Sequence, residues 1–370
     1  MPIRLAIQQR VIPAYRVPFL ELLSSQPNLE LGVFAGAPRE NERINYVKQI
    51  SHVDFHFSNN IHILKGGFYF CVQPSFNNWI RQWDPDILIV EANPRYLSTT
   101  GVVKWMSRNF KPVLGWGLGV PQYTGMLSNI RNNSRQKFLS AFSGMIAYSQ
   151  LGAKQYIQAG FCSDQVFIAK NATAPAPSTL PPQRMDFSES RKPIILYVGR
   201  LQKRKRIDSL IRVCGQLPEK LQPELWIVGE GEIRSELEML AESIYPNTKF
   251  WGEKFGNELE SIFIKADLFV LPGTGGLAVQ QAMSFALPVI VAEGDGTQSD
   301  LVNQTNGWNI SPNDENQLFA TVLEALSVPE IMREKGYAGY QTVKNDVNIE
   351  NMVSVFLEAV TETLSRKTQK

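Results

Sequence analysis

The 370-residue sequence contains few cysteines and no long hydrophobic run. The three cysteines, Cys71, Cys162 and Cys214, are scattered without metal-ligand spacing, which excludes a disulfide framework and indicates a reducing environment. The longest apolar stretches are far shorter than the roughly 20 residues that a membrane-spanning helix needs. The opening residues lack the apolar core of a secretory signal. We therefore expect a cytoplasmic protein.

Histidine is also scarce, and its three copies lie in one polar segment that the sequence does not assign to a helix or strand. This segment, residues 36–62, contains His52, His56 and His62. A metal site is one interpretation of their spacing, but three histidines alone are more simply interpreted as exposed surface residues. We expect no metal ion at the functional site.

The near-neutral total charge hides an asymmetry between the two halves of the chain. The whole chain contains 37 basic and 35 acidic residues, but residues 1–172 contain 17 basic and 9 acidic residues. The remainder contains 20 basic and 26 acidic residues. Scattered charges that serve solubility are one explanation. The other is that the basic half contacts an anionic partner, such as a lipid surface, a phosphorylated acceptor or nucleic acid.

The composition is that of a globular protein with about two domains. Hydrophobic residues make up 44% of the chain and charged residues 19%. Residues 173–192 are rich in proline and lack apolar periodicity, so they are the best candidate for an interdomain linker. We expect an N-terminal domain over residues 1–172 and a second domain over residues 193–345. A helix over residues 346–370 follows, for which packing back onto the N-terminal domain is one option.

Short apolar runs alternate with helical patterns in both halves. Such alternation, with strands that are apolar throughout, predicts parallel sheets covered by helices on both faces, and hence two Rossmann-like domains. In the N-terminal half the expected strands are residues 3–8, 29–34, 86–92, 112–116 and 144–149. In the C-terminal half the expected strands are 194–198, 225–228, 268–271 and 288–292, and the expected helices are 208–215, 232–242 and 277–285.

A basic run, GRLQKRKR over residues 199–206, follows the first expected strand of the C-terminal half. Ligands bind at the carboxyl ends of strands in such sheets, and Arg200 and Lys205 are spaced to bracket a diphosphate. The alternatives are a solvated basic turn and a nucleic-acid patch. Because no aromatic or base-reading module accompanies the run, we expect no nucleic-acid partner.

Two glycine-rich segments follow later strands. In VGEGE at residues 228–232, Gly229 and Gly231 lie at a strand end, where missing side chains let a ligand approach the backbone. The segment LPGTGGLAVQQAM at residues 271–283 leads into an expected helix. The opening amides of that helix can hold an anionic diphosphate or sugar hydroxyls. Each segment is also compatible with a purely structural turn.

Taken in order, these segments resemble the GT-B glycosyltransferases of family 4. The matching text is ILYVGRLQKRKRID, LWIVGEGE, FWGEKFGNELESIFIKADLFVLPG and GGLAVQQAMSFALPVIVA, which covers most of residues 194–310. The N-terminal half is similar more loosely, through AYRVPFLELL, DPDILIVEANPR and AYSQLGAKQYIQAG. The resemblance implies an α/β GT-B fold, in which two Rossmann-like domains with parallel sheets face each other across a cleft. It also implies that the C-terminal domain binds the donor and the N-terminal domain the acceptor.

The resemblance further implies roles for particular residues. Arg200 and Lys205 match the cationic pair that neutralises the donor diphosphate as it leaves, so they are the candidate catalytic residues. Gly252 and Glu253 match the loop that meets the nucleobase. The full set of donor-binding candidates is Gly199, Gly229, Gly231, Gly252, Glu253, Thr274, Gly275, Gly276, Leu277 and Gln281.

Two positions depart from the paired glutamates that are typical of the family. Aligning the helix puts Gly273 at the first glutamate and Gln281 at the second. The first glutamate normally fixes hydroxyls of the donor sugar, so the identity of the donor is left open. The second normally accepts a hydrogen bond from the ribose, which a glutamine carbonyl still does. An intact cationic pair favours an altered enzyme over an inactive one.

The N-terminal half lacks the glycine pair and the histidine of many relatives. Its first loop contains Tyr15 and Arg16, which we interpret, together with Glu91 at a strand end, as acceptor-binding candidates. A structural pairing of Arg16 and a surface position for Glu91 are the alternatives. Aromatic and apolar residues lie among basic ones in this half, which favours contact with an anionic membrane. The alternative is that the apolar residues are core-facing positions of amphipathic helices. The apolar residues are Trp105, Met106, Phe110 and Phe138, and the basic residues are Lys104, Arg108, Lys111, Arg131, Arg135 and Lys137.

The resemblance implies a retaining, metal-independent hexosyltransferase that requires no cofactor. Its expected reaction moves a sugar from a UDP- or GDP-sugar to a glycan or lipid-linked acceptor, in the biosynthesis of cell-surface polysaccharide or glycolipid. Its expected location is the cytoplasm, with peripheral contact at the inner face of the membrane as one option. The alternative is a catalytically inactive nucleotide-sugar-binding module, or a partner subunit of another transferase.

Overall fold

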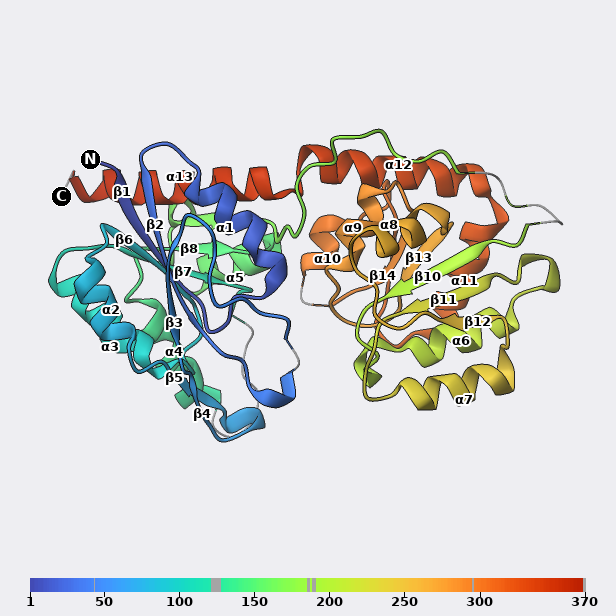
Figure 1. Ribbon diagram of the computed structural model, residues 1–370, viewed down its shortest axis with the longest axis horizontal. Coiled ribbons are helices and arrows are strands. Elements are labelled where there is room, and N and C mark those ends of the chain that lie inside the picture. The colour runs from blue at the N-terminus through green and yellow to red at the C-terminus, as the bar shows by residue number, and fades with distance from the viewer. Residues whose placement is uncertain (43, 121–127, 185–186, 188–190, 295, 369–370) are drawn as a thin grey trace. The chain divides into compact units, whose positions relative to one another are not determined.

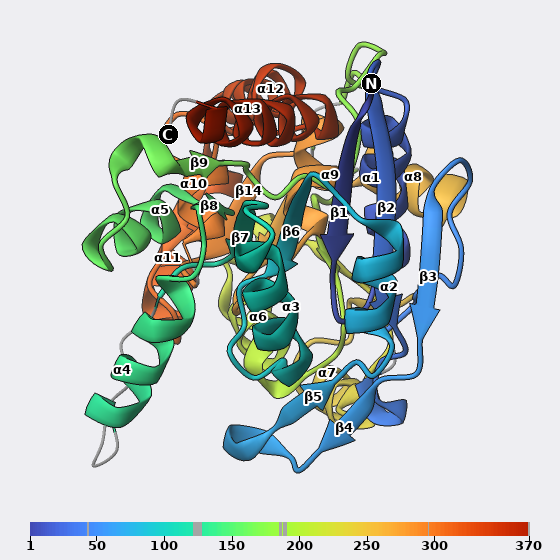
Figure 2. The same ribbon diagram turned by 90° about the vertical axis from the view of Figure 1, so that its left-hand side faces the viewer.

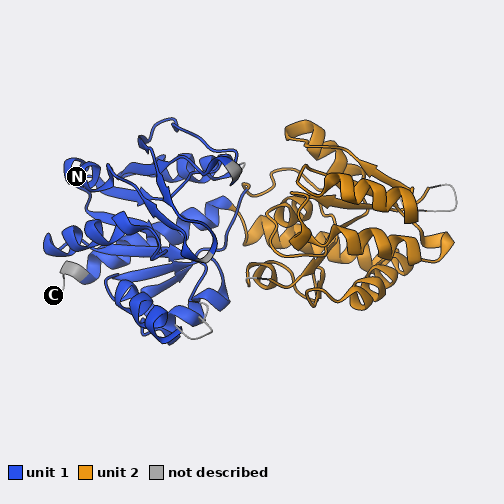
Figure 3. Ribbon diagram, turned by 90° about the horizontal axis from the view of Figure 1, so that it is seen from below, with its two compact units in different colours: residues 1–173, 349–370 blue, residues 174–348 orange. Residues whose placement is uncertain are grey.

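The computed structural model describes residues 1–42, 44–120, 128–184, 187, 191–294 and 296–368. The chain forms two compact units (Figure 3). Unit 1 comprises residues 1–173 and 349–370, and unit 2 comprises residues 174–348. The predicted linker therefore lies almost entirely in unit 2, and its residues 185–186 and 188–190 lie outside the described part of the chain.

Unit 1 is built on a seven-stranded parallel sheet (Figure 2). Its central strands are near-continuous runs of buried apolar residues, as a sheet covered on both faces requires. In β1, Leu5 and Ile7 enter one core cluster while Ala6 enters another, because successive side chains point to opposite faces. The strands in spatial order are β3 (Asp54–Ser58), β2 (Leu29–Gly36), β1 (Ile3–Gln8), β6 (Ile87–Glu91), β7 (Val113–Gly117), β8 (Gly144–Ala147) and β9 (Val166–Ile168).

Helices cover both faces of this sheet. One face packs against α1 (Val17–Ser24) and α13 (Ile349–Thr368). The other face packs against α2 (Phe76–Trp83), α3 (Leu97–Arg108) and α5 (Gln150–Gln158). Unit 1 also contains α4 (Ser128–Leu139), an antiparallel hairpin of β4 (Ile61–Ile63) and β5 (Phe70–Val72), and short 3-10 helices that include η1 (Ala14–Arg16).

The C-terminal helix α13 completes the core of unit 1. The fully buried ring of Phe356 lies 4.9 Å from the Phe19 ring on α1 and 4.9 Å from the Trp116 ring on β7, both in edge contacts. A helix from the end of the chain therefore supplies part of the hydrophobic core of the N-terminal sheet.

Unit 2 is built on a six-stranded parallel sheet (Figure 1). Its strands in spatial order are β12 (Thr248–Phe250), β11 (Glu224–Val228), β10 (Ile194–Val198), β13 (Leu268–Leu271), β14 (Val289–Ala292) and β15 (Trp308–Ile310). Its helices are α6 (Ile207–Gln216), α7 (Arg234–Ile244), α8 (Gly256–Lys265), α9 (Ala278–Ser284), α10 (Thr297–Leu301), α11 (Glu315–Ser327) and α12 (Pro329–Asn345). The central strands are buried along most of their length, like those of unit 1.

The two predicted Rossmann-like domains are confirmed, and every expected strand is present with small shifts at its ends. The segment at residues 36–62, which the sequence left unassigned, contains β3 and most of β4. The interpretation of all three histidines as exposed is wrong for two of them. The ring of His56 stacks on Phe34 at 5.1 Å, and His62 Nδ1 lies 2.9 Å from the Tyr69 hydroxyl, so both are partly buried.

None of the described helices is long and apolar enough to cross a lipid bilayer. Within the same described ranges, the side chains of histidine, cysteine, aspartate and glutamate form no group of three that could hold a metal ion.

Candidate active site

Four loops of unit 2 meet at the carboxyl edge of its sheet. They follow β12, β11, β10 and β13, which are neighbours in that order. Because these strands are parallel, the loops leave the sheet on the same side, where ligands bind in folds of this kind. The Gly229 amide donates a 2.8 Å hydrogen bond to the Gly252 carbonyl, and the Leu201 amide donates a 3.0 Å bond to the Glu230 carbonyl. The donor-binding candidates of the sequence therefore belong to one connected layer of loops.

The glycines in this layer let neighbouring loops pack backbone to backbone. A Cβ on Gly229 would lie 2.9 Å from the Gly199 carbonyl carbon, and a Cβ on Gly231 would lie 2.6 Å from the Leu201 carbonyl carbon. Real Cβ atoms essentially never come within 3.0 Å of such neighbours. A structural need, the close approach of two loops, thus accounts for both glycines.

The same reasoning applies to Gly273, which the resemblance aligns with a glutamate. A Cβ on Gly273 would lie 2.5 Å from both the Cα and the carbonyl carbon of Lys205. These are backbone atoms, which cannot move aside as a flexible side chain does. The loop after β13 therefore packs directly on the loop after β10, and it leaves no room for a glutamate at position 273.

Lys205 is the buried cation of this layer. It ends the 3-10 helix η5 (Lys203–Lys205), and its residue is only 7% exposed. Its Nζ donates hydrogen bonds of 2.7 Å to the carbonyls of Thr274 and Gly275, where Gly275 has a φ of +69°. The ammonium group is therefore fixed on the loop that the resemblance assigns to the donor sugar and phosphates.

The other predicted donor residues have more exposed positions. Arg200, Glu253 and Leu277 are exposed, and Gln281 is half-buried on α9. The glycines at 252 and 276 are half-buried, with φ values of +67° and +159°.

The amides that were expected to hold an anion precede helix α9, which begins at Ala278. Among them the Thr274 amide donates to the Arg204 carbonyl at 3.3 Å, so this group is engaged within the protein.

Sequence reasoning missed two side chains of this region. The Arg204 guanidinium donates to the Thr274 carbonyl at 3.2 Å, so Arg204 and Lys205 both contact the loop after β13. Gln280 is 2% exposed and donates to the Val347 carbonyl at 2.7 Å and the Ala174 carbonyl at 3.4 Å. Both acceptors are near the ends of unit 2, and no local pattern distinguishes this glutamine from Gln281 beside it.

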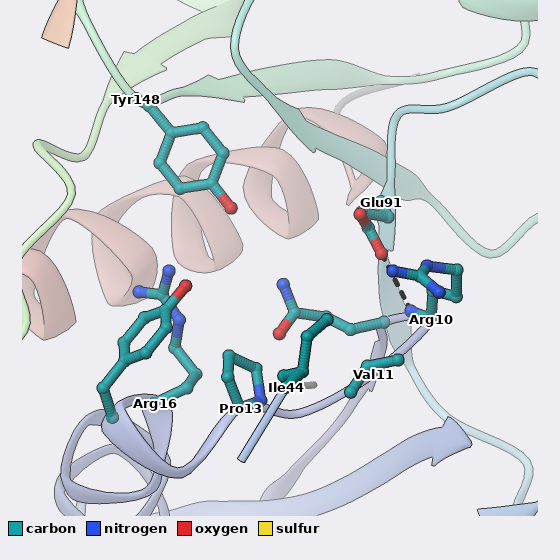
Figure 4. Close-up of a pocket in the computed structure, with 9 residues that line it drawn as sticks. Arg10, Val11, Pro13, Arg16, Ile44, Glu91 and Tyr148 are labelled. Carbon is teal, nitrogen blue, oxygen red and sulfur yellow. Dashed lines mark hydrogen bonds between the residues drawn. The ribbon is translucent and has the colours of Figure 1, made fainter. Parts of the chain in front are cut away.

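Unit 1 has a polar cavity of about 160 Å³ at the carboxyl edge of its sheet (Figure 4). The loop after β1, the end of β6 and the segment after β8 supply most of its wall. All three acceptor-binding candidates, Tyr15, Arg16 and Glu91, line this one cavity. Its other lining residues are Gln9, Arg10, Val11, Pro13, Ile44 and Tyr148.

Arg16 is 3% exposed and is held on several sides. Its guanidinium carbon lies 4.9 Å from the centre of the Trp116 ring and 5.2 Å from that of Tyr15. One terminal nitrogen donates to Asn171 Oδ1 at 2.8 Å and the other lies 3.5 Å from Met352 Sδ on α13. The side chain is therefore fixed in one orientation at the cavity wall.

Glu91 lies on the other side of the cavity from Arg16 (Figure 4). Its Oε2 accepts a 2.8 Å hydrogen bond from the Arg10 amide, and its Oε1 accepts a 3.2 Å bond from the Tyr96 hydroxyl. Burial raises the pKa of the Glu91 carboxyl above its ordinary value, although these hydrogen bonds and the charge of Arg10 oppose the shift. The carboxyl group is thus a partly desolvated acceptor beside the cavity.

An ion pair fixes the charge of the loop residue Arg10. Its guanidinium lies 2.8 Å from Glu42 Oε2, and Arg39 contacts the other oxygen at 2.9 Å. Burial raises the pKa of Glu42, but hydrogen bonds from Arg10 and Arg39 outweigh it and lower the pKa to about 2. The charge of Arg10 therefore already has a carboxylate partner.

The residues proposed for membrane contact fall into two groups. Met106 is fully buried, and Trp105 and Phe138 pack partly buried against the same core cluster, which supports their interpretation as core-facing positions. Phe110 is 81% exposed and has a φ of +56°, and it follows the exposed Arg108.

One Asp-x-Asp segment, a pattern often associated with metal binding, precedes β6 at residues 84–86. Asp84 pairs with Lys111 at 2.6 Å, and Asp86 accepts a 2.9 Å hydrogen bond from the Arg4 amide. The segment lies at the amino end of its strand, opposite the edge that carries the cavity. Its carboxylates have structural partners there.

Part of this chain matches a known protein family. Residues 183–342 match the family described as glycosyl transferases group 1. This stretch covers most of unit 2 and includes the four loops at the carboxyl edge of its sheet. The resemblance to glycosyltransferases that the motifs indicated is therefore confirmed over this stretch.

Two curated relatives each match part of the chain. A sulfoquinovosyl transferase of Arabidopsis thaliana is 34% identical over 116 residues, which is 30% of this chain and 22% of that protein. A GDP-mannose-dependent monoacylated alpha-(1-6)-phosphatidylinositol monomannoside mannosyltransferase of Corynebacterium glutamicum is 28% identical over 181 residues, 46% of this chain and 47% of that protein. The chain therefore matches less than half the length of these relatives.

Solved structures extend the likeness of fold to both units. HepE of Anabaena, solved in complex with UDP, has a TM-score of 0.71 and 15% sequence identity, and the match covers 98% of this chain and 100% of that one. At this identity the likeness concerns the fold alone. The chain has the predicted GT-B fold, with two Rossmann-like domains.

Proposed function

We propose that this protein is a glycosyltransferase that moves a sugar from a nucleotide-sugar donor to a glycan or lipid-linked acceptor. The observation that carries the proposal is that the family match over residues 183–342 includes the loop layer around Lys205. A relative named for its GDP-mannose dependence and a structural neighbour that binds UDP support a UDP- or GDP-sugar as the donor. The name of the Corynebacterium glutamicum relative, which specifies a phosphatidylinositol mannoside, also supports a role in glycolipid biosynthesis.

In this proposal the chemistry depends on stabilising the leaving nucleoside diphosphate. As the bond between the sugar and the diphosphate breaks, negative charge grows on the phosphate oxygens, and fixed cations beside them lower the barrier. Lys205, a buried residue of the loop after β10, supplies such a charge where it contacts the loop after β13, and Arg200 is a second, exposed cation of the loop after β10. The leaving phosphate takes the proton of the acceptor hydroxyl, so neither a protein nucleophile nor a metal ion is required.

We propose that the sugar keeps its anomeric configuration, with the acceptor hydroxyl attacking from the face that the diphosphate leaves. The anomeric configuration of the new bond is testable with any acceptor that the protein uses, natural or not. NMR of the product formed from an α-linked donor is expected to show an α-linked sugar, and a β-linked product would contradict this part of the proposal.

The acceptor site is assigned to the cavity of unit 1. Its wall combines a carboxyl group, two tyrosines and two arginines, which together donate and accept hydrogen bonds as sugar hydroxyls require. Glu91 contributes the acceptor oxygens, and the exposed ring of Tyr15, at 40% exposure, contributes an apolar surface.

Peripheral contact of unit 1 with an anionic membrane is part of the same proposal. The excess of basic residues in its sequence and the exposed ring of Phe110 support it. Flotation with liposomes that contain an anionic lipid tests it. Binding at low salt that weakens at high salt and on Phe110→Ser is expected, whereas flotation that neither change alters would contradict it.

A panel of nucleotide sugars tests the donor assignment. A ligand that binds only the native state raises the melting temperature, so at least one UDP- or GDP-sugar is expected to do so. Turnover then separates the enzyme from the alternative, a nucleotide-sugar-binding module or partner subunit. Donor hydrolysis or transfer that is lost in Arg200→Ala supports the enzyme, and nucleotide binding without turnover for every donor supports the module.

A further inference from the structure

The cavity of unit 1 contains a buried positive charge whose direct partners are all neutral. Arg16 is 3% exposed, and its terminal nitrogens contact the amide oxygen of Asn171 and the sulfur of Met352. Its Nε is buried and has no hydrogen-bond partner in the described part of the chain. Within those same ranges Arg16 contacts no carboxylate, whereas Arg10 in the same wall is paired with Glu42. Burying a charge in this way is costly unless another group compensates it.

The acidic group on the far side of the cavity does not contact Arg16. Glu91 already accepts hydrogen bonds from the Arg10 amide and the Tyr96 hydroxyl, and burial raises its pKa, although these bonds and the charges of Arg10 and Arg16 oppose the shift. Figure 4 shows the Arg16 guanidinium and the Glu91 carboxyl group facing the cavity from opposite sides. The end of the cavity at Arg16 therefore carries positive charge, and the end at Glu91 offers acceptor oxygens.

Further polar groups face the space between these two ends. The Oε1 of Gln9, a residue with 6% exposure, is buried without a hydrogen-bond partner among the described residues. The hydroxyl of Tyr148 points into the cavity (Figure 4), and burial raises its pKa, so this group is a neutral donor. A cavity of about 160 Å³ is large enough to hold several water molecules. That space suits one small polar group or a sugar ring.

We propose that this cavity binds an anionic group of the acceptor, a phosphate or a carboxylate, with Arg16 as its counter-charge. The inference rests on the proposed function, in that it assigns an acidic acceptor to the acceptor site. The anion occupies the Arg16 end, where a guanidinium and the Tyr148 hydroxyl donate to its oxygens. Neutral hydroxyls of the same acceptor lie toward Gln9 and Glu91, which supply acceptor oxygens. An acceptor without a negative charge leaves the guanidinium without a charged group in direct contact.

Binding of small probes tests the charge requirement directly. Isothermal titration of the full chain with inorganic phosphate, glucuronate and glucose is expected to give binding for the two anions and at least tenfold weaker binding for glucose. Arg16→Gln, which keeps a donor toward Asn171, is expected to lower anion affinity at least tenfold. The matched control Arg81→Gln removes an exposed arginine of the same unit and is expected to leave the affinity unchanged. Equal affinity for glucose and glucuronate, or unchanged anion affinity in Arg16→Gln, would overturn the proposal.

A second measurement on the unmodified protein covers the case in which Arg16→Gln does not fold. The side-chain Nε–Hε signal of Arg16 in arginine-labelled protein is expected to shift as phosphate is added and to saturate at the same concentration as the titration. A signal that does not move overturns the proposal without any variant.

A competing nucleotide separates the acceptor from the donor as the source of the anion. With UDP present, phosphate is expected to shift the Arg16 signal as before, and loss of that shift would assign the cavity to the donor and overturn the acceptor assignment. The outcome also separates this inference from the proposed function. Transfer activity without anion binding at Arg16 defeats the inference alone, and anion binding without any sugar transfer defeats the proposed function alone.

Discussion

Adding a side chain at position 273 tests whether loop packing, rather than chemistry, excludes the family's glutamate. In Gly273→Ala the new Cβ meets the Lys205 Cα and carbonyl carbon at 2.5 Å, so the two loops must separate by about 1 Å to reach ordinary contact. Overpacking of this kind costs about 1–3 kcal/mol. At roughly 2–4 °C per kcal/mol for a unit of this size, we expect the melting temperature to fall by several degrees.

The same displacement should act on the charge of Lys205. Its Nζ contacts the carbonyls of residues 274 and 275, directly after the altered position, so its ammonium is expected to shift with the loop. Gly273→Glu therefore does not restore the family's glutamate function, and its transfer rate is expected to fall below that of the natural sequence. Urea denaturation at several temperatures, followed by a transfer assay on the folded variants, measures both effects.

Gly101→Ala is the matched control for this experiment. Gly101 lies within α3, and a Cβ there meets nothing within 4 Å. Replacing a helical glycine with alanine is expected to raise the free energy of unfolding by about 0.5–1 kcal/mol. If Gly273→Ala is as stable as the natural sequence while Gly101→Ala behaves as expected, the packing argument is refuted.

Three further predictions concern single side chains. Glu42→Gln is expected to lower the free energy of unfolding by about 1.5–3 kcal/mol at neutral pH, because it removes the charged partner of Arg10. The folded pKa of Glu42 is about 2, below its ordinary 4.5, so the natural protein keeps this stabilisation above pH 4.5 and loses it as the pH falls toward 2. Acid unfolding of both proteins measures this difference. Phe356→Ala is expected to cost about 3–5 kcal/mol in urea unfolding of unit 1, because its ring is fully buried between Phe19 and Trp116. Gln280→Ala is expected to cost about 1–3 kcal/mol in unit 2, because it leaves the buried Val347 carbonyl without its donor.

Neighbouring positions supply controls for two of these changes. Ser354→Ala changes an exposed residue of the same helix as Phe356, and Gln281→Ala changes the half-buried residue next to Gln280, so both are expected to stay within about 0.5 kcal/mol of the natural protein. A Phe356→Ala variant as stable as Ser354→Ala would show that α13 does not complete the core of unit 1. For Glu42, an equal loss of stability on acidification in both proteins would contradict the ion-pair account.

The sequence predicts the central strands well because each is a continuous apolar run that is buried on both faces. Residues 194–198 and 268–271 are such runs, and they form β10 and β13 at the expected positions. The edge strands are harder to predict because they are short or only partly buried, so their sequences lack a continuous apolar run. β12 and β15 have only three residues each, and β3 carries partly exposed residues on both faces.

Some features of the candidate sites can be predicted from the sequence and others cannot. Loops after strands are visible in the sequence because glycine and basic residues follow apolar runs, and the loop layer of unit 2 confirms that arrangement. The surroundings of Arg16 are not visible, since Asn171 and Met352 come from segments far away along the chain. The burial of Arg16 and its lack of a contacting carboxylate depend on how these distant segments pack together, so no local sequence pattern predicts them.

The central claim is that this protein transfers a sugar by stabilising a leaving nucleoside diphosphate at the carboxyl edge of the unit 2 sheet. The most direct measurement is the release of UDP or GDP from its sugar donors by the purified full chain, compared with Arg200→Ala and Lys205→Met at matched donor occupancy. We predict nucleotide release by the natural sequence and at least a hundredfold slower release by each variant, a difference of about 3 kcal/mol in the barrier. Release that proceeds equally fast in all three proteins would contradict the account.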